Sequence, residues 1–361
     1  MNWAEDFLYK NFFKPLLFNL YPENAHDVSF ELLKLADKIP GIFSILEKNF
    51  SFKSARLNTT VSKIQFQNPL GMAAGFDKTG EYFPFFEKLG FGYAEVGTIT
   101  GEEQPGNPKP RLFRYPNQDA FINRMGFNNP GSEKAFQILS TQNNSIPMGI
   151  NIGKTKVVDL ENALEDYLKS YKKLYPLSDY CAINISSPNT PGLRSLQEKD
   201  TLASLVGGLR KELGGSFPIP TFIKFAPDFT DTEFEKLLDV VLDLGVQGII
   251  LTNTTLDKSL LQEKNPEEGG LSGKPLREKS THLIRLARKK LNGRLNIIGV
   301  GGIDSGESAL EKILAGADLI QIYTGYIYNG PNLPSTILKY IDNYLEENGI
   351  KNISEIVGKF V

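Results

Sequence analysis

The 361-residue chain has very little of the residue types from which metal and disulfide sites are built. Its one cysteine, Cys181, excludes an intramolecular disulfide framework and a multi-cysteine metal or iron–sulfur site. The two histidines, His26 and His282, are too few for a His-rich metal site. We therefore expect no bound metal.

Long apolar runs and an excess of charge of one sign are also missing. No stretch reaches about 18 uninterrupted apolar residues, so no membrane-spanning helix is expected. Lys and Arg total 40 against 42 Asp and Glu, which gives no overall field that would attract nucleic acid. The first residues include Glu5 and Asp6 and show no basic segment followed by an apolar run, so neither a signal nor a transit peptide is expected.

The first 55 residues are rich in aromatic residues and in helical periodicity. A first helix is expected up to Pro22, a second after Asn24 and a third after Pro40, which together form a helical hairpin. Composition alone leaves open whether this region packs on the rest of the protein or touches a membrane. The apolar residues that recur at helical spacing in the first helix are Trp3, Phe7, Leu8, Phe12, Leu16 and Leu20.

From about Ser62 onward, short apolar runs alternate with longer amphipathic segments. This is the pattern of βα units, and eight runs in order predict a closed (β/α)8 TIM barrel of the α/β class within residues 56–361. Residues 100–129 are too long for an ordinary βα loop, so we expect an insertion over one mouth of the barrel. The runs cover residues 70–74, 93–96, 148–152, 180–185, 221–225, 248–252, 296–300 and 319–323.

Polar residues gather where these runs stop, and barrel active sites lie at the carboxyl ends of the strands. The glycine-rich segments 269–273 and 299–303 suit a phosphate held by backbone N–H groups. Lys224, inside the fifth run, needs an anionic partner because an unpaired buried ammonium is costly. The electron-rich edge of a flavin is one such partner and a structural carboxylate such as Asp77 is the other; both remain open.

Four asparagines are expected to face one pocket: Asn123, Asn184, Asn189 and Asn253. Paired amide donors and acceptors recognise a flat ring that bears alternating C=O and N–H groups. Lys78 could neutralise a substrate carboxylate, so the set describes a pyrimidine acid. Neither histidine accompanies the strand ends, which argues against a hydrolase triad.

With these residues assembled, the chain resembles the class 2, quinone-dependent dihydroorotate dehydrogenases along nearly its full length. The resemblance rests on NPLGMAAGFDK (68–78), EVGTIT (95–100), QPGNPKPRLFR (104–114), INRMGFNN (122–129) and INISSPNTPGLR (183–194), followed by IKFAPD, LTNTT, GGLSGKPL and GVGGI. It implies oxidation of (S)-dihydroorotate to orotate in de novo UMP synthesis, with reduction of FMN and its reoxidation by a membrane quinone. It also implies a peripheral protein on the cytoplasmic side of the cell membrane.

The resemblance also assigns residues by motif position. Ser187 falls at the position of the catalytic base, where class 1 enzymes have cysteine; an isolated serine is a poor base and needs a relay. The implied FMN contacts are Ala74, Gly75, Lys78, Thr98, Asn151, Asn184, Lys224, Thr252, Gly273, Gly302, Tyr323 and Thr324. The implied orotate contacts are Lys78, Asn123, Arg124, Met125, Gly126, Phe127, Asn184, Asn189, Asn253 and Thr254. The implied quinone contacts are His26 and Arg114, and the apolar residues expected near the quinone entrance are Phe12, Leu16, Leu17, Phe30 and Leu33.

Three other interpretations stay open at this point. A class 1 enzyme with a soluble acceptor is disfavoured by the N-terminal hairpin and by Ser187. A flavin-free, phosphate-binding isomerase or synthase barrel would be colourless when purified, whereas a flavoprotein is yellow. A membrane-surface module with a decayed site is disfavoured by the intact lysine and asparagine set.

Overall fold

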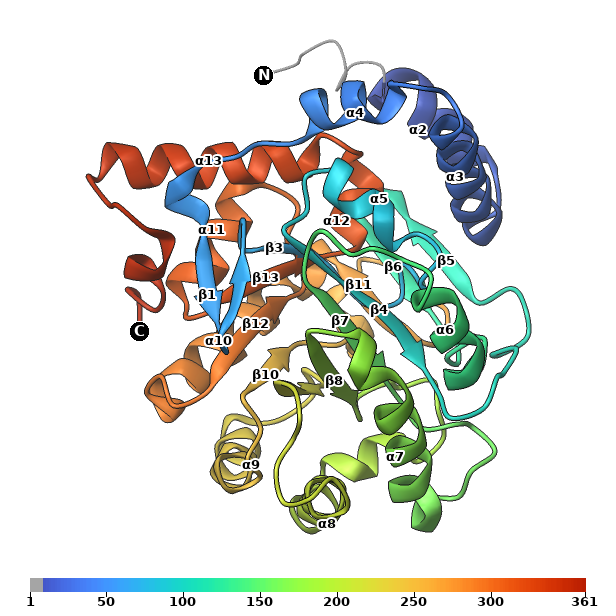
Figure 1. Ribbon diagram of the computed structural model, residues 1–361, viewed down its shortest axis with the longest axis vertical. Coiled ribbons are helices and arrows are strands. Elements are labelled where there is room, and N and C mark those ends of the chain that lie inside the picture. Colours follow the sequence, from blue (N-terminus) through green and yellow to red (C-terminus); the bar gives the residue numbers. More distant parts are fainter. Residues whose placement is uncertain (1–8) are drawn as a thin grey trace.

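The computed structural model describes residues 9–361 and has a closed barrel of eight parallel strands at its centre (Figure 1). The barrel order is β10-β12-β13-β3-β4-β7-β8-β9, so all eight predicted runs form its strands. Five of the eight end one to three residues from the predicted limit, and the largest difference is at β4, which continues to Ile99. The strands are β3 (Leu70–Met72), β4 (Tyr93–Ile99), β7 (Met148–Ile152), β8 (Tyr180–Asn184), β9 (Thr221–Phe225), β10 (Gly248–Leu251), β12 (Asn296–Val300) and β13 (Leu319–Ile322).

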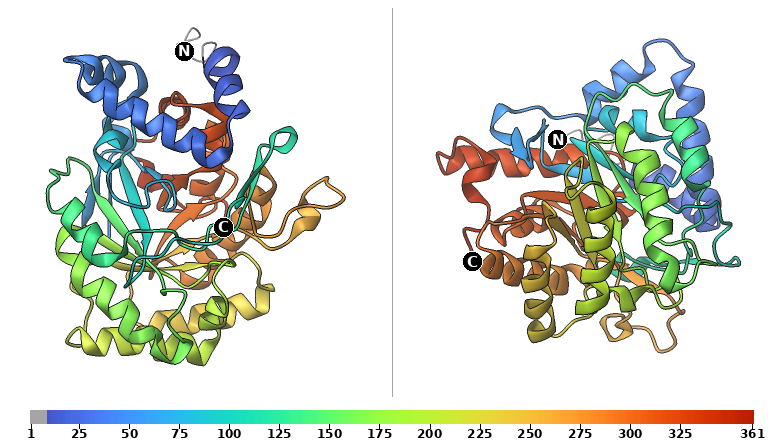
Figure 2. Two further views of the ribbon diagram at one scale, coloured as in Figure 1. Left: turned by 90° about the vertical axis from the view of Figure 1, so that its right-hand side faces the viewer. Right: turned by 60° about the horizontal axis from the view of Figure 1, so that its bottom comes forward.

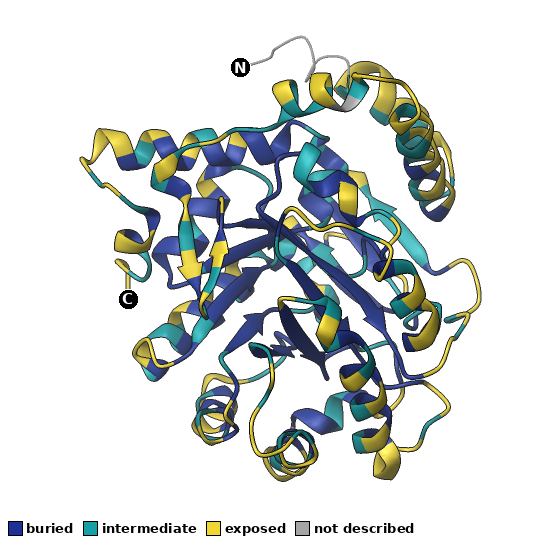
Figure 3. Cartoon of the chain, viewed as in Figure 1, coloured by how far each residue is buried: buried dark blue, intermediate teal, exposed yellow. Residues whose placement is uncertain are grey.

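Helices surround the barrel and turn their buried faces toward it (Figure 3). In α9 (Asp231–Asp243) the hydroxyl of Thr230 and the carboxylate of Glu233 form a capping box, and the buried positions follow helical spacing from Phe234 to Val241. The other outer helices are α5 (Phe83–Lys88), α6 (Gly131–Leu139), α7 (Ala163–Leu174), α8 (Lys199–Glu212), α10 (Arg277–Leu291), α11 (Gly306–Leu314), α12 (Thr324–Asn329) and α13 (Leu333–Glu347).

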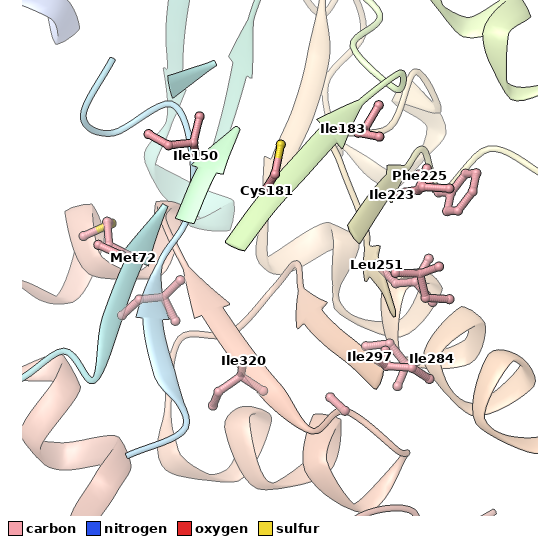
Figure 4. Close-up of a cluster of buried hydrophobic side chains, with 14 of the residues drawn as sticks. Met72, Ile150, Cys181, Ile183, Ile223, Phe225, Leu251, Ile284, Ile297 and Ile320 are labelled. Atoms are coloured by element: carbon pink, nitrogen blue, oxygen red, sulfur yellow. The ribbon is translucent and has the colours of Figure 1, made fainter. Parts of the chain in front are cut away.

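The apolar core between the strands and the helices contains the one cysteine. Cys181 is 2% exposed and lies among aliphatic side chains such as Ile150 and Ile183 (Figure 4). Burial, together with the charge of Glu95, raises the pKa of its thiol well above the usual value, so this cysteine is chemically inert. The prediction that Cys181 is a core residue is therefore confirmed.

The interior of the barrel is filled by large aromatic rings that face glycines. A Cβ atom on Gly149 would lie 2.1 Å from the ring of Tyr180, and one on Gly71 would lie 2.4 Å from the ring of Tyr93. The β1–β2 hairpin (Thr59–Val61 and Ile64–Phe66) adds two apolar side chains to the same cluster and closes the end of the barrel at which the strands begin. This end is therefore solid, and a ligand can enter only at the other.

The predicted insertion has a small sheet of its own. Strands β5 (Leu112–Tyr115) and β6 (Ala120–Asn123) form a hairpin, and β11 (Gly270–Gly273) pairs with β6. Figure 2 shows the long segments around this sheet projecting from one side of the barrel. Two connections far apart in the sequence therefore build one cover.

The N-terminal region forms η1 (Tyr9–Phe13), α2 (Lys14–Asn19), α3 (Pro22–Asp37) and α4 (Ile42–Phe50). Pro22 ends the first helix as predicted, but it also occupies the first turn of α3, so the second helix begins before Asn24. The expected apolar residues Trp3, Phe7 and Leu8 lie outside the described residues. Within residues 9–361, every helix is too short or too polar to cross a lipid bilayer.

Because the rings leave no space at the glycines, we expect Gly149→Ala to lower the free energy of unfolding by about 3 kcal/mol. The matched control is Gly207→Ala within α8, where a Cβ atom would meet nothing within 4 Å; it should raise stability by up to about 1 kcal/mol, because alanine is the better helix former. Urea-unfolding midpoints measure both changes. Equal midpoints for the two variants would contradict the packing described for the barrel interior.

Candidate active site

A cavity lies at the carboxyl ends of the barrel strands, beneath the β5–β6–β11 sheet. Its wall comes from the ends of seven of the eight strands or the loops that follow them, all except β7, together with the insertion. The sequence-predicted residues that line it are Ala74, Gly75, Lys78, Thr98, Asn123, Met125, Gly126, Phe127, Asn184, Ser187, Asn189, Lys224, Thr252, Asn253, Thr254, Gly273, Gly302, Tyr323 and Thr324.

Of the predicted FMN and orotate contacts, two lie outside this lining. Asn151 is fully buried below it and accepts a hydrogen bond from Thr98 Oγ1 at 2.6 Å. The guanidinium of Arg124 pairs with Glu267 at 3.0 Å and lies over the ring of Phe113, so its side chain points away from the cavity. Asn151 thus supports the cavity wall through Thr98. Arg124 stabilises the region of the β5–β6–β11 sheet, which covers the cavity.

Beneath the cavity, the ammonium of Lys224 lies 3.6 Å from Oε1 of Glu95, and both side chains are almost fully buried. The other oxygen of this carboxylate accepts hydrogen bonds from Tyr180 and from Gln321 at 3.1 and 3.0 Å, while Asn151 donates to Oε1 at 2.7 Å. These three hydrogen bonds and the nearby ammonium replace the water that a buried carboxylate would otherwise need. The carboxylate suggested by sequence, Asp77, is not this partner; it accepts the N–H groups of its own turn.

The amide side chains around the cavity are bonded to one another across strand ends. Asn184 donates to Thr98 Oγ1 and to Asn151 Oδ1, both at 3.1 Å. Asn189 donates to Asn123 Oδ1 at 3.1 Å, which links the loop after β8 to strand β6. The predicted convergence of the four asparagines on one pocket is confirmed, since Asn253 lines it as well.

One wall of the cavity consists of backbone. A Cβ atom on Gly302 would lie 2.4 Å from Cα of Arg277, and one on Gly325 would lie 2.1 Å from the carbonyl oxygen of Ile303. Gly273 and Gly302 also have positive φ, at 99° and 71°. A side chain fits at none of these positions, which leaves peptide groups to face a ligand, as anion sites require.

Ser187 is 5% exposed, and its hydroxyl oxygen accepts the N–H of Asn189 at 3.3 Å. Within residues 9–361, no carboxylic acid or imidazole group forms a hydrogen bond with this oxygen. Three buried polar atoms near the site lack a partner in the described part of the chain: Thr190 Oγ1, Thr254 Oγ1 and Gln321 Oε1. The last two belong to residues that line the cavity, so they are available to a ligand.

Comparison with known proteins identifies the family. The family model described as dihydroorotate dehydrogenase matches residues 56–345. The chain belongs to this family.

Curated relatives and solved structures agree with the assignment. Relatives from Christiangramia forsetii and Chloroflexus aurantiacus, each named dihydroorotate dehydrogenase (quinone), are 44% and 45% identical over 95% and 94% of the chain and cover 100% and 98% of those proteins. A crystal structure of the Eimeria tenella enzyme in complex with ferulenol aligns with a TM-score of 0.82 and 35% identity, over 95% of this chain and 98% of that one.

In this member of the dihydroorotate dehydrogenase family, the N-terminal helices are bonded to the cavity wall. His26 Nε2 lies 2.8 Å from the carbonyl oxygen of Phe76, two residues before Lys78. Burial, reinforced by the charge of Lys78, lowers the pKa of His26, which makes the neutral ring the donor. Arg111 pairs with the buried Glu23 at 2.9 Å and ties α3 to the insertion.

Arg114 caps the helix α2. Its guanidinium donates to the carbonyl oxygens of Leu20 at 2.6 Å and Phe18 at 3.2 Å, and it lies over the ring of Phe18. Of the residues expected at the quinone entrance, Phe30 is buried and stacks on Tyr82. Phe12 and Leu16 are 61% and 66% exposed.

Because Glu95 compensates the charge of Lys224, we expect Glu95→Gln to lower the free energy of unfolding by about 3 kcal/mol or more. The control is Glu133→Gln, which breaks an exposed pair with Lys173 and should cost less than about 1 kcal/mol. Urea unfolding of the two variants compares them directly. If Glu95→Gln unfolds at the parent midpoint, the buried pair does not carry the proposed charge compensation.

Proposed function

We propose that this protein oxidises (S)-dihydroorotate to orotate in pyrimidine biosynthesis, with FMN as the flavin and a membrane quinone as the final electron acceptor. The observation that carries this function is the convergence of the four asparagines, Lys78 and Ser187 on one cavity with a backbone wall. The names of the curated relatives support the same substrate and acceptor. The alternative of a flavin-free isomerase or synthase is disfavoured, because the cavity holds Lys224 together with asparagine side chains that suit a flat ring.

The residues present fit FMN. Backbone at Gly273, Gly302 and Thr324 would hold its phosphate, and the ammonium of Lys224 would lie at the electron-rich edge of the ring. Ala74, Gly75, Lys78, Thr98, Asn184, Thr252 and Tyr323 complete the proposed FMN contacts, with Asn151 acting through Thr98 and Asn184. When bound, FMN supplies the acceptor for the hydride that leaves C6 of the substrate.

The side chains of the protein orient the substrate and remove its proton. Lys78 pairs with the substrate carboxylate. The C=O and N–H groups of the ring form hydrogen bonds with the side-chain amides of Asn123, Asn184, Asn189 and Asn253. The hydroxyl of Thr254, which lacks a protein partner, offers a further contact. Ser187 Oγ takes the proton from C5, and the enclosed site keeps bulk water from that atom. Met125, Gly126 and Phe127 close the pocket over the ring, and Arg124 stabilises the loop after β6 that carries them.

The N-terminal region is proposed to serve the quinone. We assign residues 1–55 to membrane association and quinone access, and residues 56–361 to catalysis, with His26 and Arg114 as polar contacts of the quinone head. Nine of the fifteen exposed large hydrophobic side chains in the described residues lie on η1, α2, α3, α4 or the turns between them. Such a surface suits peripheral binding to a bilayer, which we place on the cytoplasmic side.

The central test is anaerobic reduction of the bound flavin by dihydroorotate, followed by reoxidation with a quinone, fumarate or NAD in parallel. We expect the quinone to be the efficient acceptor. Ser187→Ala should retain FMN and bind orotate, yet reduce its flavin at least about 100-fold more slowly, because only the proton-removing group has gone. A Ser187→Ala variant that reduces flavin at the parent rate would show that Ser187 is structural.

Orotate affinity should depend on the charge of Lys78. Burial lowers the pKa of Lys78 to about 8, so the ammonium is present below that pH and is lost above it. The dissociation constant of orotate, measured by titration of the flavin spectrum, should therefore rise about tenfold per pH unit above this pKa. Lys78→Arg, which stays charged, should bind with no such dependence; the same slope in both proteins would contradict the assignment.

Binding to lipid should depend on the exposed apolar residues of α2 and α3. Leu16→Glu combined with Leu32→Glu should weaken binding to phosphatidylcholine–phosphatidylglycerol vesicles at least about tenfold, since each buried leucine contributes about 2 kcal/mol. Oxidation by a vesicle-bound quinone should slow, while flavin reduction stays unchanged. Val157→Glu, at a site 87% exposed on the loop after β7, is the control and should affect neither. Unchanged vesicle binding in the double variant would place the membrane contact elsewhere.

A further inference from the structure

Arg194 follows the loop that carries Ser187, and its three guanidinium nitrogens each bind a different segment. Nε donates to the carbonyl oxygen of Ser186 at 3.1 Å, Nη2 donates to the carbonyl oxygen of Thr254 at 2.9 Å, and Nη1 donates to Asp228 at 2.8 Å. These segments are the loops after β8, β10 and β9, respectively. Arg194 does not line the cavity, so it touches neither substrate nor cofactor.

Asp228 anchors the guanidinium from the other side. Its carboxylate also accepts the N–H of Leu256 at 3.0 Å, the hydroxyl of Thr255, and the ammonium of Lys279 on α10 at 3.0 Å. Burial alone would raise its pKa, but these bonds and the one from Arg194 hold it below the usual value. The Arg194–Asp228 pair thus connects the loops after β8, β9 and β10 with helix α10.

The bond to Ser186 acts directly on the orientation of Ser187. A peptide group is planar, so the carbonyl of Ser186 and the N–H of Ser187 move as one unit. The side chain of Ser186 is held as well, because its hydroxyl accepts from Asn253 at 2.9 Å and donates to Asn184 at 3.0 Å. The Ser187 hydroxyl has only the N–H of Asn189 as a described partner, so its position depends on this backbone.

We propose that Arg194, anchored by Asp228, is a positioning residue that sets Ser187 for proton removal and Thr254 for substrate binding. The inference rests on the proposed role of Ser187 as the base. A displacement of about 1 Å at a reacting group slows catalysis by about 100-fold, which the loss of two carbonyl contacts is enough to produce. Because reoxidation of the flavin uses neither loop, the effect is confined to the half-reaction with dihydroorotate.

Arg194→Lys is the sharpest test, since lysine keeps the charge for Asp228 but cannot reach two carbonyl oxygens at once. In the FMN-loaded protein, flavin reduction at saturating dihydroorotate should fall about 10- to 100-fold. FMN content and quinone reoxidation should stay at parent values, and orotate affinity should change less than the rate does. Arg210→Lys, which alters a partly exposed arginine bonded to the carbonyl oxygen of Asp243, is the matched control and should change none of these.

A double-mutant cycle separates positioning from general stabilisation. If Arg194 acts through Ser187, Arg194→Lys should slow flavin reduction by less than twofold in a Ser187→Ala background. An equal loss in both backgrounds, or an equal loss in quinone reoxidation, overturns the proposal. Asp228→Asn removes the charge that anchors the guanidinium of Arg194, so it should show the same selective loss. It is the second test if Arg194→Lys does not fold.

The controls also separate this proposal from the assignment of the base. Parent-rate flavin reduction by Ser187→Ala contradicts the proposed role of Ser187 as the base. Loss of reduction in Ser187→Ala together with a parent rate in Arg194→Lys contradicts only the positioning role.

Discussion

The buried ion pair of Lys224 and Glu95 is the constraint on which the rest of the site depends. An ammonium inside a barrel is tolerated only where an anion and hydrogen bonds replace water, and Glu95 supplies that anion 3.6 Å away. Holding the carboxylate requires Tyr180 and Gln321 from two further strands. Tyr180 is also the ring that fills the space beside Gly149. Charge compensation and interior packing are therefore linked through one side chain.

The side chains inside the barrel accordingly lie in three layers along its axis. Aromatic rings and the β1–β2 hairpin fill the end where the strands begin, the polar network around Glu95 comes next, and the cavity occupies the end where the strands stop. Each layer supports the next, because Asn151 bonds both Glu95 below and Thr98 above it. The cavity floor is consequently rigid, which suits a site that must hold a flat ring in a fixed plane.

The sequence predicted the barrel well because its strands are buried on both faces and so appear as uninterrupted apolar runs, as in Met148–Ile152 and Thr221–Phe225. It located the strand-end asparagines for the same reason. It did not identify the partner of Lys224, because β4 and β9 are not neighbours in the barrel and meet only across its interior. Glu95 nevertheless carried a usable signal: like Lys224, it is a charged residue inside an apolar run. Arg194 carried none, since its role depends on three loops that converge only in the fold.

The N-terminal helices, which are proposed to serve the quinone, contact the same wall of the cavity as the proposed substrate site. A helical region joined only by its chain connection would be free to move, but α3 is fixed by the buried Glu23–Arg111 pair and by the bond from His26 to the carbonyl oxygen of Phe76. Phe76 lies two residues before Lys78, which lines the cavity. A change in the position of α3 therefore acts on the segment that holds the proposed carboxylate contact. These contacts join the helices to the barrel, so the proposed membrane contact and the proposed substrate site are linked through a single stretch of backbone.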